Sequence, residues 1–430
     1  MDEKEAKQRM RKRNMKIFPT YKMLAWDFLF FYAIDFLFLT QIKGISPADI
    51  VLKSSFFALF NIFLQIPASI IVEFIGRKNG AVLGNFLNCL YITMLMISRN
   101  LQDLIIADFV AAMAYSIKNT AEPSLLNASI PPSKYKSKIF SRITMKGMSR
   151  YYTLSCISKI LGGILFSVNP YLPMFCSLCV LIIVTMLSSL LIEPVKKSGK
   201  SEISYKKNIK EIKEGFTYVL KVDRLKALIL CSSLISALLG VLQNYSTSIY
   251  RDIKLSAVAI GIVSACGSII SSISSRKQEM FHKHFRNKSL MTISLTLSFA
   301  CIIAGVCGIG AENSFVLLII TVGGVWLYNI SHGMYYTIIE KYLRNFTNKN
   351  IDTKIFAANN LACNSMRFLV GIIASFLLDK MSTAYCLITI GVVFTVIYIL
   401  TGQYMKTRVG KKPSEYSAEE TKYDELHLQE

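Results

Sequence analysis

A short stretch of this chain, QIPASIIVEFIGRKNG at residues 65–80, decides how the rest is organised. Its apolar part contains the carboxylate Glu73 near its end, and the basic turn Gly76-Arg77-Lys78 follows before the next apolar run. A glycine permits a tight turn, and cations at the end of an apolar run are typical of the cytoplasmic side of a membrane. We therefore expect two membrane helices joined here. Glu73, Gly76, Arg77 and Lys78 are expected to form a latch that closes in one conformation and opens in another.

The bulk composition is that of a polytopic membrane protein. Of 430 residues, 53% are hydrophobic and only 18% are charged, with a mean hydropathy of +0.43. The formal net charge is +22, but lysines and arginines are concentrated in short segments between apolar runs. This distribution favours contact with anionic membrane lipids and argues against nucleic-acid binding. The ten cysteines include a single CxxC spacing, Cys176 to Cys179, with no second CxxC to pair with it, and they mostly lie in apolar runs, which favours packing over disulfides or metal binding.

Twelve apolar segments are long enough to cross a hydrocarbon core of ~30 Å as helices. Connections rich and poor in cations alternate between them, and an odd number of helices would break this alternation. By the positive-inside rule both termini are cytoplasmic, so we expect an all-α, multi-pass protein of the cell (cytoplasmic) membrane. The segments lie near residues 24–42, 54–74, 80–98, 102–122, 146–168, 172–192, 226–250, 257–275, 289–309, 315–338, 357–378 and 383–404.

The longest polar connection, residues 194–225, divides the twelve segments into two sets of six. Within it the amphipathic pattern of Tyr205 to Leu220 predicts a surface helix. A faint repeat supports the division, since Lys159 precedes Gly163 by four residues as Arg367 precedes Gly371. The expected parts are a basic cytoplasmic N-terminus (1–23), an N-terminal six-helix half (24–193), a cytoplasmic linker (194–225), a C-terminal six-helix half (226–405) and a cytoplasmic tail (406–430).

The stretch at residues 65–80 resembles the signature between helices 2 and 3 of the major facilitator superfamily. The residues that match in register are Ile66, Pro67, Gly76, Arg77 and Lys78. Phe74 stands where the family commonly has a cation, so the latch is expected to be weaker than usual. The resemblance implies twelve transmembrane helices in two six-helix halves related by pseudo-two-fold symmetry, with a midplane site that opens alternately to each side.

A second resemblance concerns the direction of transport. Residues 120–128, TAEPSLLNA, are similar to a helix 4 pattern of bacterial drug-exporter-like members, which favours export. Many exporters of the superfamily also have an arginine in the upper part of helix 4, where this chain has Asp108. Proton antiport is therefore inferred from the intramembrane charges and not from a motif.

Polar residues recur at helical spacing on some spans, whereas the spans near 172–192, 289–309 and 383–404 are almost uniformly apolar, as lipid-facing helices are. In the superfamily helices 1, 4, 7 and 10 line the cavity, and here these spans carry the polar stripes. The candidates for the substrate and proton pathway are Asp27, Asp35, Asp108, Tyr115, Lys118, Glu122, Lys159, Gln243, Asn329, His332, Tyr336 and Arg367.

The charged candidates carry the most information, because an ionised side chain at membrane depth costs ~2.5–3.5 kcal/mol, and such residues are therefore usually paired or functional. Asp35 lies deeper in its span than Asp27 and is favoured as the carboxylate that takes up and releases a proton. The alternative is a static ion pair with a cation such as Lys159 or Arg367.

Two further pairs have their own interpretations. Lys118 and Glu122, four residues apart, predict a local salt bridge. Lys159 and Arg367, related by the repeat, predict two cations that hold an anionic or zwitterionic ligand between them.

The sequence thus predicts a secondary active transporter of a small organic solute that works by alternating access, with proton-coupled export preferred. Uptake of an anionic or zwitterionic nutrient is the alternative, and a transport-dead sensor or a membrane enzyme is disfavoured because no catalytic constellation is present. No cofactor or metal is expected, because Gly305–Gly310 ends a membrane helix and His282 and His284 have no third ligand. The expected partners are the substrate, protons and membrane lipids, and no nucleic acid.

Overall fold

The computed structural model describes residues 3–131, 135–193, 205–285, 288–345 and 352–408, and within these ranges every regular element is helical. Among these described residues, ten helices are long and apolar enough to span a membrane. The helices are α1 (Glu3–Ala25), α2 (Asp35–Leu37), the π-helix η1 (Phe38–Ile42), α3 (Pro47–Ile75), α4 (Arg77–Ile97), α5 (Leu101–Ser129), α6 (Lys136–Val168), α7 (Leu172–Ser189), α8 (Tyr205–Lys221), α9 (Asp223–Asp252), α10 (Ala257–Phe285), α11 (Ser289–Gly308), α12 (Phe315–Asn345), α13 (Asp352–Lys380) and α14 (Thr383–Arg408).

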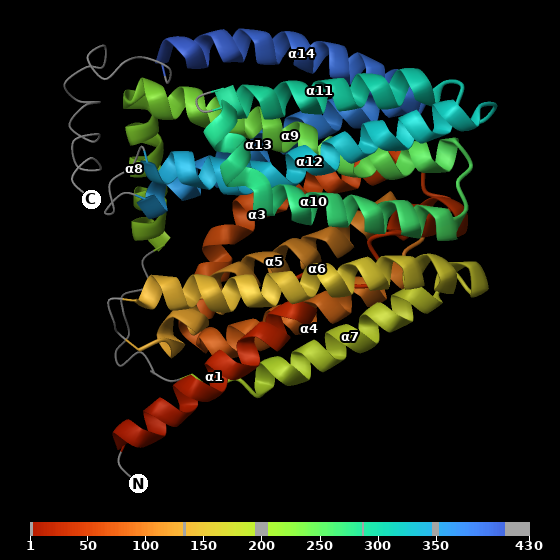
Figure 1. Cartoon of the computed structure of the whole chain (residues 1–430). Coiled ribbons are helices and arrows are strands. Elements are labelled where there is room, and N and C mark those ends of the chain that lie inside the picture. Colours follow the sequence, from red (N-terminus) through yellow and green to blue (C-terminus); the bar gives the residue numbers. More distant parts are fainter. Residues whose placement is uncertain (1–2, 132–134, 194–204, 286–287, 346–351, 409–430) are drawn as a thin grey trace. The chain divides into compact units, whose positions relative to one another are not determined.

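Two further passages complete the twelve. One is α5, which matches the predicted segment 102–122 but carries Asp108, Lys118 and Glu122 in its interior. The other runs from α1 to η1 and is interrupted. The predicted segments otherwise coincide with single long helices, so the all-α, twelve-helix architecture is confirmed (Figure 1).

The prediction of one continuous helix over residues 24–42 is wrong. α1 ends at Ala25, residues 26–34 form bends and turns, and helical structure resumes only at Asp35. Phe30 has a φ of +67°, which a residue with a side chain rarely adopts. Within the turn region Ile34 N–H donates to the carbonyl of Phe31 at 2.9 Å. The first membrane passage, which runs from α1 to η1, is therefore interrupted between Ala25 and Asp35.

Neighbouring helices supply hydrogen bonds to the broken segment. The ammonium of Lys118, on α5, donates to the carbonyl oxygen of Ala25 at 2.8 Å. The hydroxyl of Ser177, on α7, donates to the carbonyl oxygen of Leu29. Backbone groups at membrane depth need partners inside the protein, because the hydrocarbon offers none. Side chains from two other helices thus replace hydrogen bonds that the helix no longer makes.

A glycine on α6 makes room for the same segment. A Cβ atom at Gly162 would lie 2.5 Å from the carbonyl oxygen of Phe30, and backbone does not move aside easily. Gly162 therefore leaves the space that the backbone of Phe30 occupies. The break depends on three surrounding helices, α5, α6 and α7.

The chain forms two compact units. Unit 1 comprises Met1–Ser46, Phe56–Tyr205 and Ser256–Cys266, and unit 2 comprises Pro47–Ser55, Lys206–Leu255 and Gly267–Glu430. α3 and α10 are thus each divided between the units.

The N-terminal part of each of these two helices contacts a different unit from the rest of the helix. In unit 2 the hydroxyl of Ser375, on α13, donates to the carbonyl of Ala48 on α3 at 2.8 Å. In unit 1 Gly163, on α6, lies directly against the backbone of Ala257 at the start of α10, with no room for a Cβ between them. These contacts tie α3 to α13 within unit 2 and α6 to α10 within unit 1.

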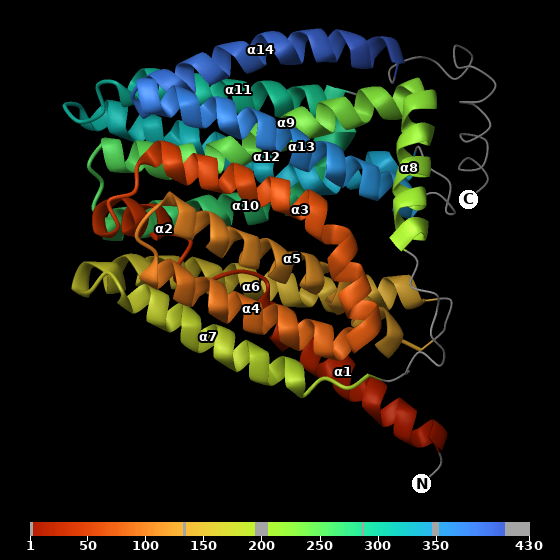
Figure 2. The ribbon, with the colours of Figure 1, turned by 180° about the vertical axis from the view of Figure 1, so that it is seen from behind.

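In unit 1 a buried apolar cluster joins α1, α5 and α7, and Figure 2 shows the helices of this unit from behind. Small residues allow α4 to approach α3 and α5, because a Cβ at Gly80 would lie 3.0 Å from Val72 and 3.1 Å from Ala121. Close approach through small residues is how membrane helices gain packing energy without a hydrophobic driving force. The unit thereby holds α1 and its break in a defined position.

In unit 2, α9 is the most enclosed span, with 83% of its most apolar stretch buried by other helices. The predicted surface helix is confirmed as α8, which runs crosswise to the long helices in Figure 1. α8 is fixed to the start of α13, since Lys354 Nζ lies 2.6 Å from Glu214 Oε2. A Cβ at Gly215 would lie 2.6 Å from the carbonyl oxygen of Lys354, so the two helices touch at backbone distance.

Candidate functional site

Asp27 lies at the start of the break and is surrounded by polar aromatic side chains. The hydroxyl of Tyr151, on α6, donates to Asp27 Oδ2 at 3.1 Å, and the N–H of Phe28 donates to Oδ1 at 3.0 Å. The ring of Tyr151 also packs against Trp26, with centroids 6.2 Å apart. A carboxylate at the end of a broken helix is therefore held by a phenol from a neighbouring helix.

Asp35 begins the short helix on the far side of the break. Its Oδ1 accepts a hydrogen bond from the N–H of Phe36 at 2.7 Å, which stabilises the helix start. Lys159, on α6, interacts electrostatically with both Asp27 and Asp35. The structure thus brings three of the sequence candidates to one region of unit 1.

Glu122, on α5, is the centre of a second cluster in unit 1 and is only 2% exposed. Tyr21 Oη and Lys22 Nζ each lie 2.7 Å from its carboxylate, whereas Lys118 lies at 3.8 Å. The expected pair with Lys118 is present, but the shorter contacts come from α1. Asn85, on α4, donates to Tyr21 Oη at 2.8 Å and extends the network.

The remaining candidates on α5 lie in different surroundings. Asp108 is buried, with 2% exposure, whereas Tyr115 is 54% exposed and its ring packs against Phe57 on α3. Their shared spacing therefore does not give them a shared environment.

In unit 2 the guanidinium of Arg367, on α13, bridges two neighbouring helices. Its Nε donates to the carbonyl of Ser236 on α9 at 3.2 Å, and its Nη2 donates to the hydroxyl of Tyr336 on α12 at 3.0 Å. The side chain lies over Gly240, where a Cβ would be 3.7 Å from Arg367 Cγ. Arg367 is partly exposed and Tyr336 is exposed, so the pair is available to a ligand.

Three aromatic rings follow one another along α12, and the last of them is Tyr336, the partner of Arg367. The centroids of Tyr328 and His332 are 5.8 Å apart, and those of His332 and Tyr336 are 5.5 Å apart. Asn329 faces α10, where the hydroxyl of Ser271 donates to its carbonyl oxygen at 2.8 Å. α12 therefore presents a row of rings that ends at Arg367.

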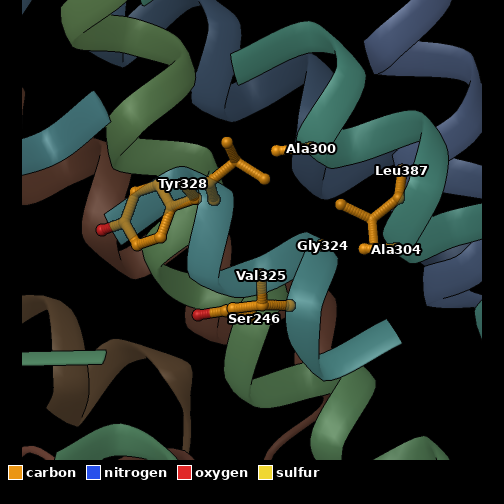
Figure 3. Close-up of a pocket in the computed structure, with 8 residues that line it drawn as sticks. Ser246, Ala300, Ala304, Gly324, Val325, Tyr328 and Leu387 are labelled. Carbon is orange, nitrogen blue, oxygen red and sulfur yellow. The ribbon is translucent and has the colours of Figure 1, made fainter. Parts of the chain in front are cut away.

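The last candidate, Gln243, is exposed on α9. The nearby apolar cavity of unit 2 lies between Tyr328, Val325, Gly324, Ala300 and Leu387 (Figure 3). Its volume is about 10 Å³, close to the space of a single water, so it is no substrate site.

The latch region has a partner that the sequence interpretation did not include. Gly76 has a φ of +89°, which confirms the expected tight turn. Glu193, after α7, places its Oε1 3.9 Å from Arg77 Nε, and its Oε2 accepts a hydrogen bond from the N–H of Lys78 at 3.1 Å. An anion at the first turn of α4 is favourable because the free N–H groups there point toward it. Glu73 is exposed.

Several site residues were missed for an identifiable reason. Tyr21 and Lys22 belong to the basic first segment and were therefore assigned to the aqueous side, whereas Tyr151 lies inside the predicted segment 146–168 but carries no charge that would single it out. Glu193 could have been found, because it ends an apolar run as Glu73 does. Asn85 carries no sequence signal that separates it from other polar residues in apolar runs.

The family model of the Major Facilitator Superfamily matches residues 23–371, which is most of the chain. The chain belongs to the Major Facilitator Superfamily. The resemblance at residues 65–80 is thereby confirmed at the level of the superfamily. The sequence matches none of the curated proteins with which it was compared.

Solved transporters of this type share the fold. The nucleoside transporter NupG superposes with a TM-score of 0.70 at 13% identity, covering 94% of this chain and 100% of that chain. A POT family transporter in complex with 5-aminolevulinic acid gives 0.66 at 13% identity, with 93% and 95% covered. A bacterial homolog of the human lysosomal transporter Spinster, inward-facing and unoccupied, gives 0.64 at 11% identity, with 93% and 98% covered.

Membership of the superfamily and the ten apolar helices identify a multi-pass membrane protein with the fold of a secondary transporter. They indicate a transporter rather than an enzyme.

Proposed function

We propose that this transporter exports a small organic solute across the cell membrane in exchange for protons, with both termini in the cytoplasm. The orientation is supported by the cation-rich connections at one end of the helices. The pattern at residues 120–128 supports export and a place in the drug-exporter-like branch.

The observation that carries proton coupling is the group of carboxylates and lysines around the broken segment of unit 1. Four of the candidate carboxyl groups lie on the break, on α2 and in the interior of α5: Asp27, Asp35, Asp108 and Glu122. Lys22 and Lys118 lie against Glu122, and Lys159 lies near Asp27 and Asp35. A carboxylate within a membrane-spanning region is costly unless a cation or a proton neutralises it, so a pair of carboxylates in this position favours the uptake of a proton.

The short contacts identify where that proton would bind. Glu122 is fully paired with Lys22 and Tyr21 and is expected to stay ionised. Lys159 lies near both Asp27 and Asp35, so a proton taken up by one of these carboxylates leaves Lys159 to the other. We place the proton on this pair of carboxylates.

The two ends of the break can respond to that proton. When both carboxylates are charged they compete for Lys159, and when one is neutral the competition ends. A change in the position of Lys159 is transmitted along α6 to the contact of Gly163 with the start of α10. Proton binding is thereby linked to the packing of a helix that the two units share.

The direct test uses proteoliposomes that contain a pH-sensitive dye in the lumen. Each compound class is added in turn to the outside: organic amines, carboxylates, nucleosides and dipeptides. A coupled exporter inserted with its cytoplasmic face outward moves protons out of the lumen as its substrate enters, so the luminal pH rises on addition of one class only. Substrate flux of the full chain with no proton movement would contradict proton coupling.

Uptake of an anionic or zwitterionic solute is a second candidate, and Arg367 supports it. Its guanidinium is held by Ser236 and Tyr336 beside three aromatic rings, an arrangement suited to a carboxylate on a flat molecule. In the same assay a carboxylate that enters together with protons would lower the luminal pH. Binding of a ligand without any flux would instead support a sensor that does not transport.

A further inference from the structure

α6 carries a run of like charges before its apolar part begins. Lys138, Arg142, Lys146 and Arg150 follow at intervals of four residues, and all four are exposed. Residues four apart are neighbours on a helix surface, so each consecutive pair repels. The helix contains no Asp or Glu, and in the described part of the chain none of the four takes part in an ion pair. An anion that binds between these side chains would relieve the repulsion.

The side of α6 that carries Lys146 and Arg150 continues as an exposed apolar face. Its members, spaced at helical intervals beyond Arg150, are Ile157, Leu161, Ile164 and Val168. Exposed apolar side chains on a membrane-spanning helix face lipid. From Arg150 to Val168 the helix rises by about 27 Å, close to the thickness of a hydrocarbon core. Arg150 and Lys146 therefore lie at the depth of the lipid headgroups.

α1 adds a second basic face beside the first. Its exposed cations, at intervals that keep them on one side of the helix, are Arg9, Lys12, Arg13 and Lys16. The opposite side of α1 is fixed, since Asn14 Nδ2 donates to Ser129 Oγ at 2.9 Å and to the carbonyl of Ile192 at 2.6 Å. The basic face thus has a defined direction.

The two faces meet within unit 1. Arg150 Nη1 donates to Thr20 Oγ1 on α1 at 3.3 Å, and Thr20 lies one turn beyond Lys16. α1 and α6 pack side by side (Figure 1), with Gly147 leaving space for Lys22. The exposed cations of both helices form one surface, which we call the α1–α6 basic surface.

We propose that the α1–α6 basic surface binds the phosphate headgroup of anionic phospholipids. A headgroup phosphate accepts charge-assisted hydrogen bonds from several cations at once and relieves the repulsion along α6. A lipid fits better than a soluble anion because the surface continues directly into a lipid-facing apolar face, which the acyl chains can follow. The site is separate from the carboxylates of the break and does not depend on transport.

The test measures lipid binding to the full chain in detergent by native mass spectrometry, with phosphatidylglycerol or phosphatidylcholine added. Wild type is expected to retain phosphatidylglycerol in preference to phosphatidylcholine. The triple variant Arg142→Gln, Lys146→Gln, Arg150→Gln is expected to bind phosphatidylglycerol roughly 100-fold more weakly, the effect of three cations lost near a charged surface. Exchanging the residue types instead, by Arg142→Lys, Lys146→Arg and Arg150→Lys, keeps the charge and should keep the preference.

A matched control removes the same charge elsewhere. Arg276→Gln, Lys277→Gln and Lys283→Gln, at exposed positions of α10 in unit 2, should leave the preference unchanged. Equal retention of both lipids by wild type, or an unchanged preference in the α6 triple variant, would overturn the proposal. Soluble glycerol phosphate that competes as strongly as the lipid would show a site for free anions and would also overturn it. If the triple variant does not fold, lipid binding to wild type is measured in high salt instead. The preference for phosphatidylglycerol must then disappear, because salt screens the cations of the surface.

Discussion

The ammonium of Lys118 donates a hydrogen bond to the carbonyl oxygen of Ala25 at 2.8 Å and so closes the end of α1 with a side chain from α5. The last carbonyl groups of a helix lack partners within the helix, and at membrane depth there is no water to replace them. The same ammonium lies 3.8 Å from Glu122, which Lys22 also binds. Lys118 therefore contributes both to the end of α1 and to the surroundings of the Glu122 carboxylate.

Replacing Lys118 with Met keeps the length of the side chain and removes its charge. The carbonyl of Ala25 then loses its donor, which is expected to destabilise the folded chain by about 1–3 kcal/mol. The effect should appear as a lower melting temperature in detergent. Lys254→Met is the control, since this side chain is 78% exposed and its replacement should change nothing. Equal melting temperatures for Lys118→Met and wild type would contradict the role of Lys118.

Gly162→Ala tests whether the break needs space on α6. The new Cβ would lie 2.5 Å from the carbonyl oxygen of Phe30, so overpacking is expected to destabilise the chain by about 1–3 kcal/mol. Gly323→Ala on α12 is the matched control, because no atom lies within 4 Å of a Cβ there. Alanine favours helix, so the control should be as stable as wild type or more stable. Equal melting temperatures for Gly162→Ala and Gly323→Ala would contradict the role of Gly162 in the break.

Glu193→Gln tests the partner of the latch. It removes the negative charge from the first turn of α4 and from Arg77, and is expected to lower stability by about 0.5–2 kcal/mol. The loss should shrink in high salt, because both side chains are partly exposed, at 25% for Arg77 and 21% for Glu193. Glu312→Gln, in the exposed pair with Lys254, is the control and should have no measurable effect. A salt-independent change would instead indicate lost packing.

Arg367→Lys tests the proposed anion site of unit 2. Lysine keeps the charge but does not reproduce the fork that reaches Ser236 and Tyr336 together. For a carboxylate substrate we expect KM to rise about tenfold, the effect of one lost hydrogen bond to a charged group, with kcat little changed. Arg251→Lys, next to Asp252 and outside the site, should leave both parameters as in wild type. A changed kcat with an unchanged KM would rule out a role in substrate binding.

Most of the fold could be predicted, because length and hydropathy alone identify spans in a bilayer. The turn at Gly76 and the surface helix from Tyr205 were also accessible, since each depends on local residue types. The break between α1 and α2 could not be predicted. Residues 28–39 are almost continuously apolar and read as helix, whereas the break depends on Lys118, Gly162 and Ser177, which are distant in sequence.

The candidate residues show the same limit. Sequence spacing correctly brought Lys118 near Glu122, but the shorter contacts come from Tyr21 and Lys22, about a hundred residues away. Spacing also placed Asp108 and Tyr115 on one face, although one is buried and the other exposed. Which residues share a helix face is local information, whereas what that face meets depends on tertiary packing.

Proton binding by the carboxylates of the break is the central claim, and proton flux in proteoliposomes tests it most directly. We expect Asp27→Asn, Asp35→Asn or both to abolish substrate-dependent proton movement while substrate exchange without a pH gradient continues. Asp379→Asn, whose side chain is 61% exposed, is expected to behave as wild type. If the double variant Asp27→Asn, Asp35→Asn still moves protons at the wild-type rate, the coupling proton does not bind at the break and the account is wrong.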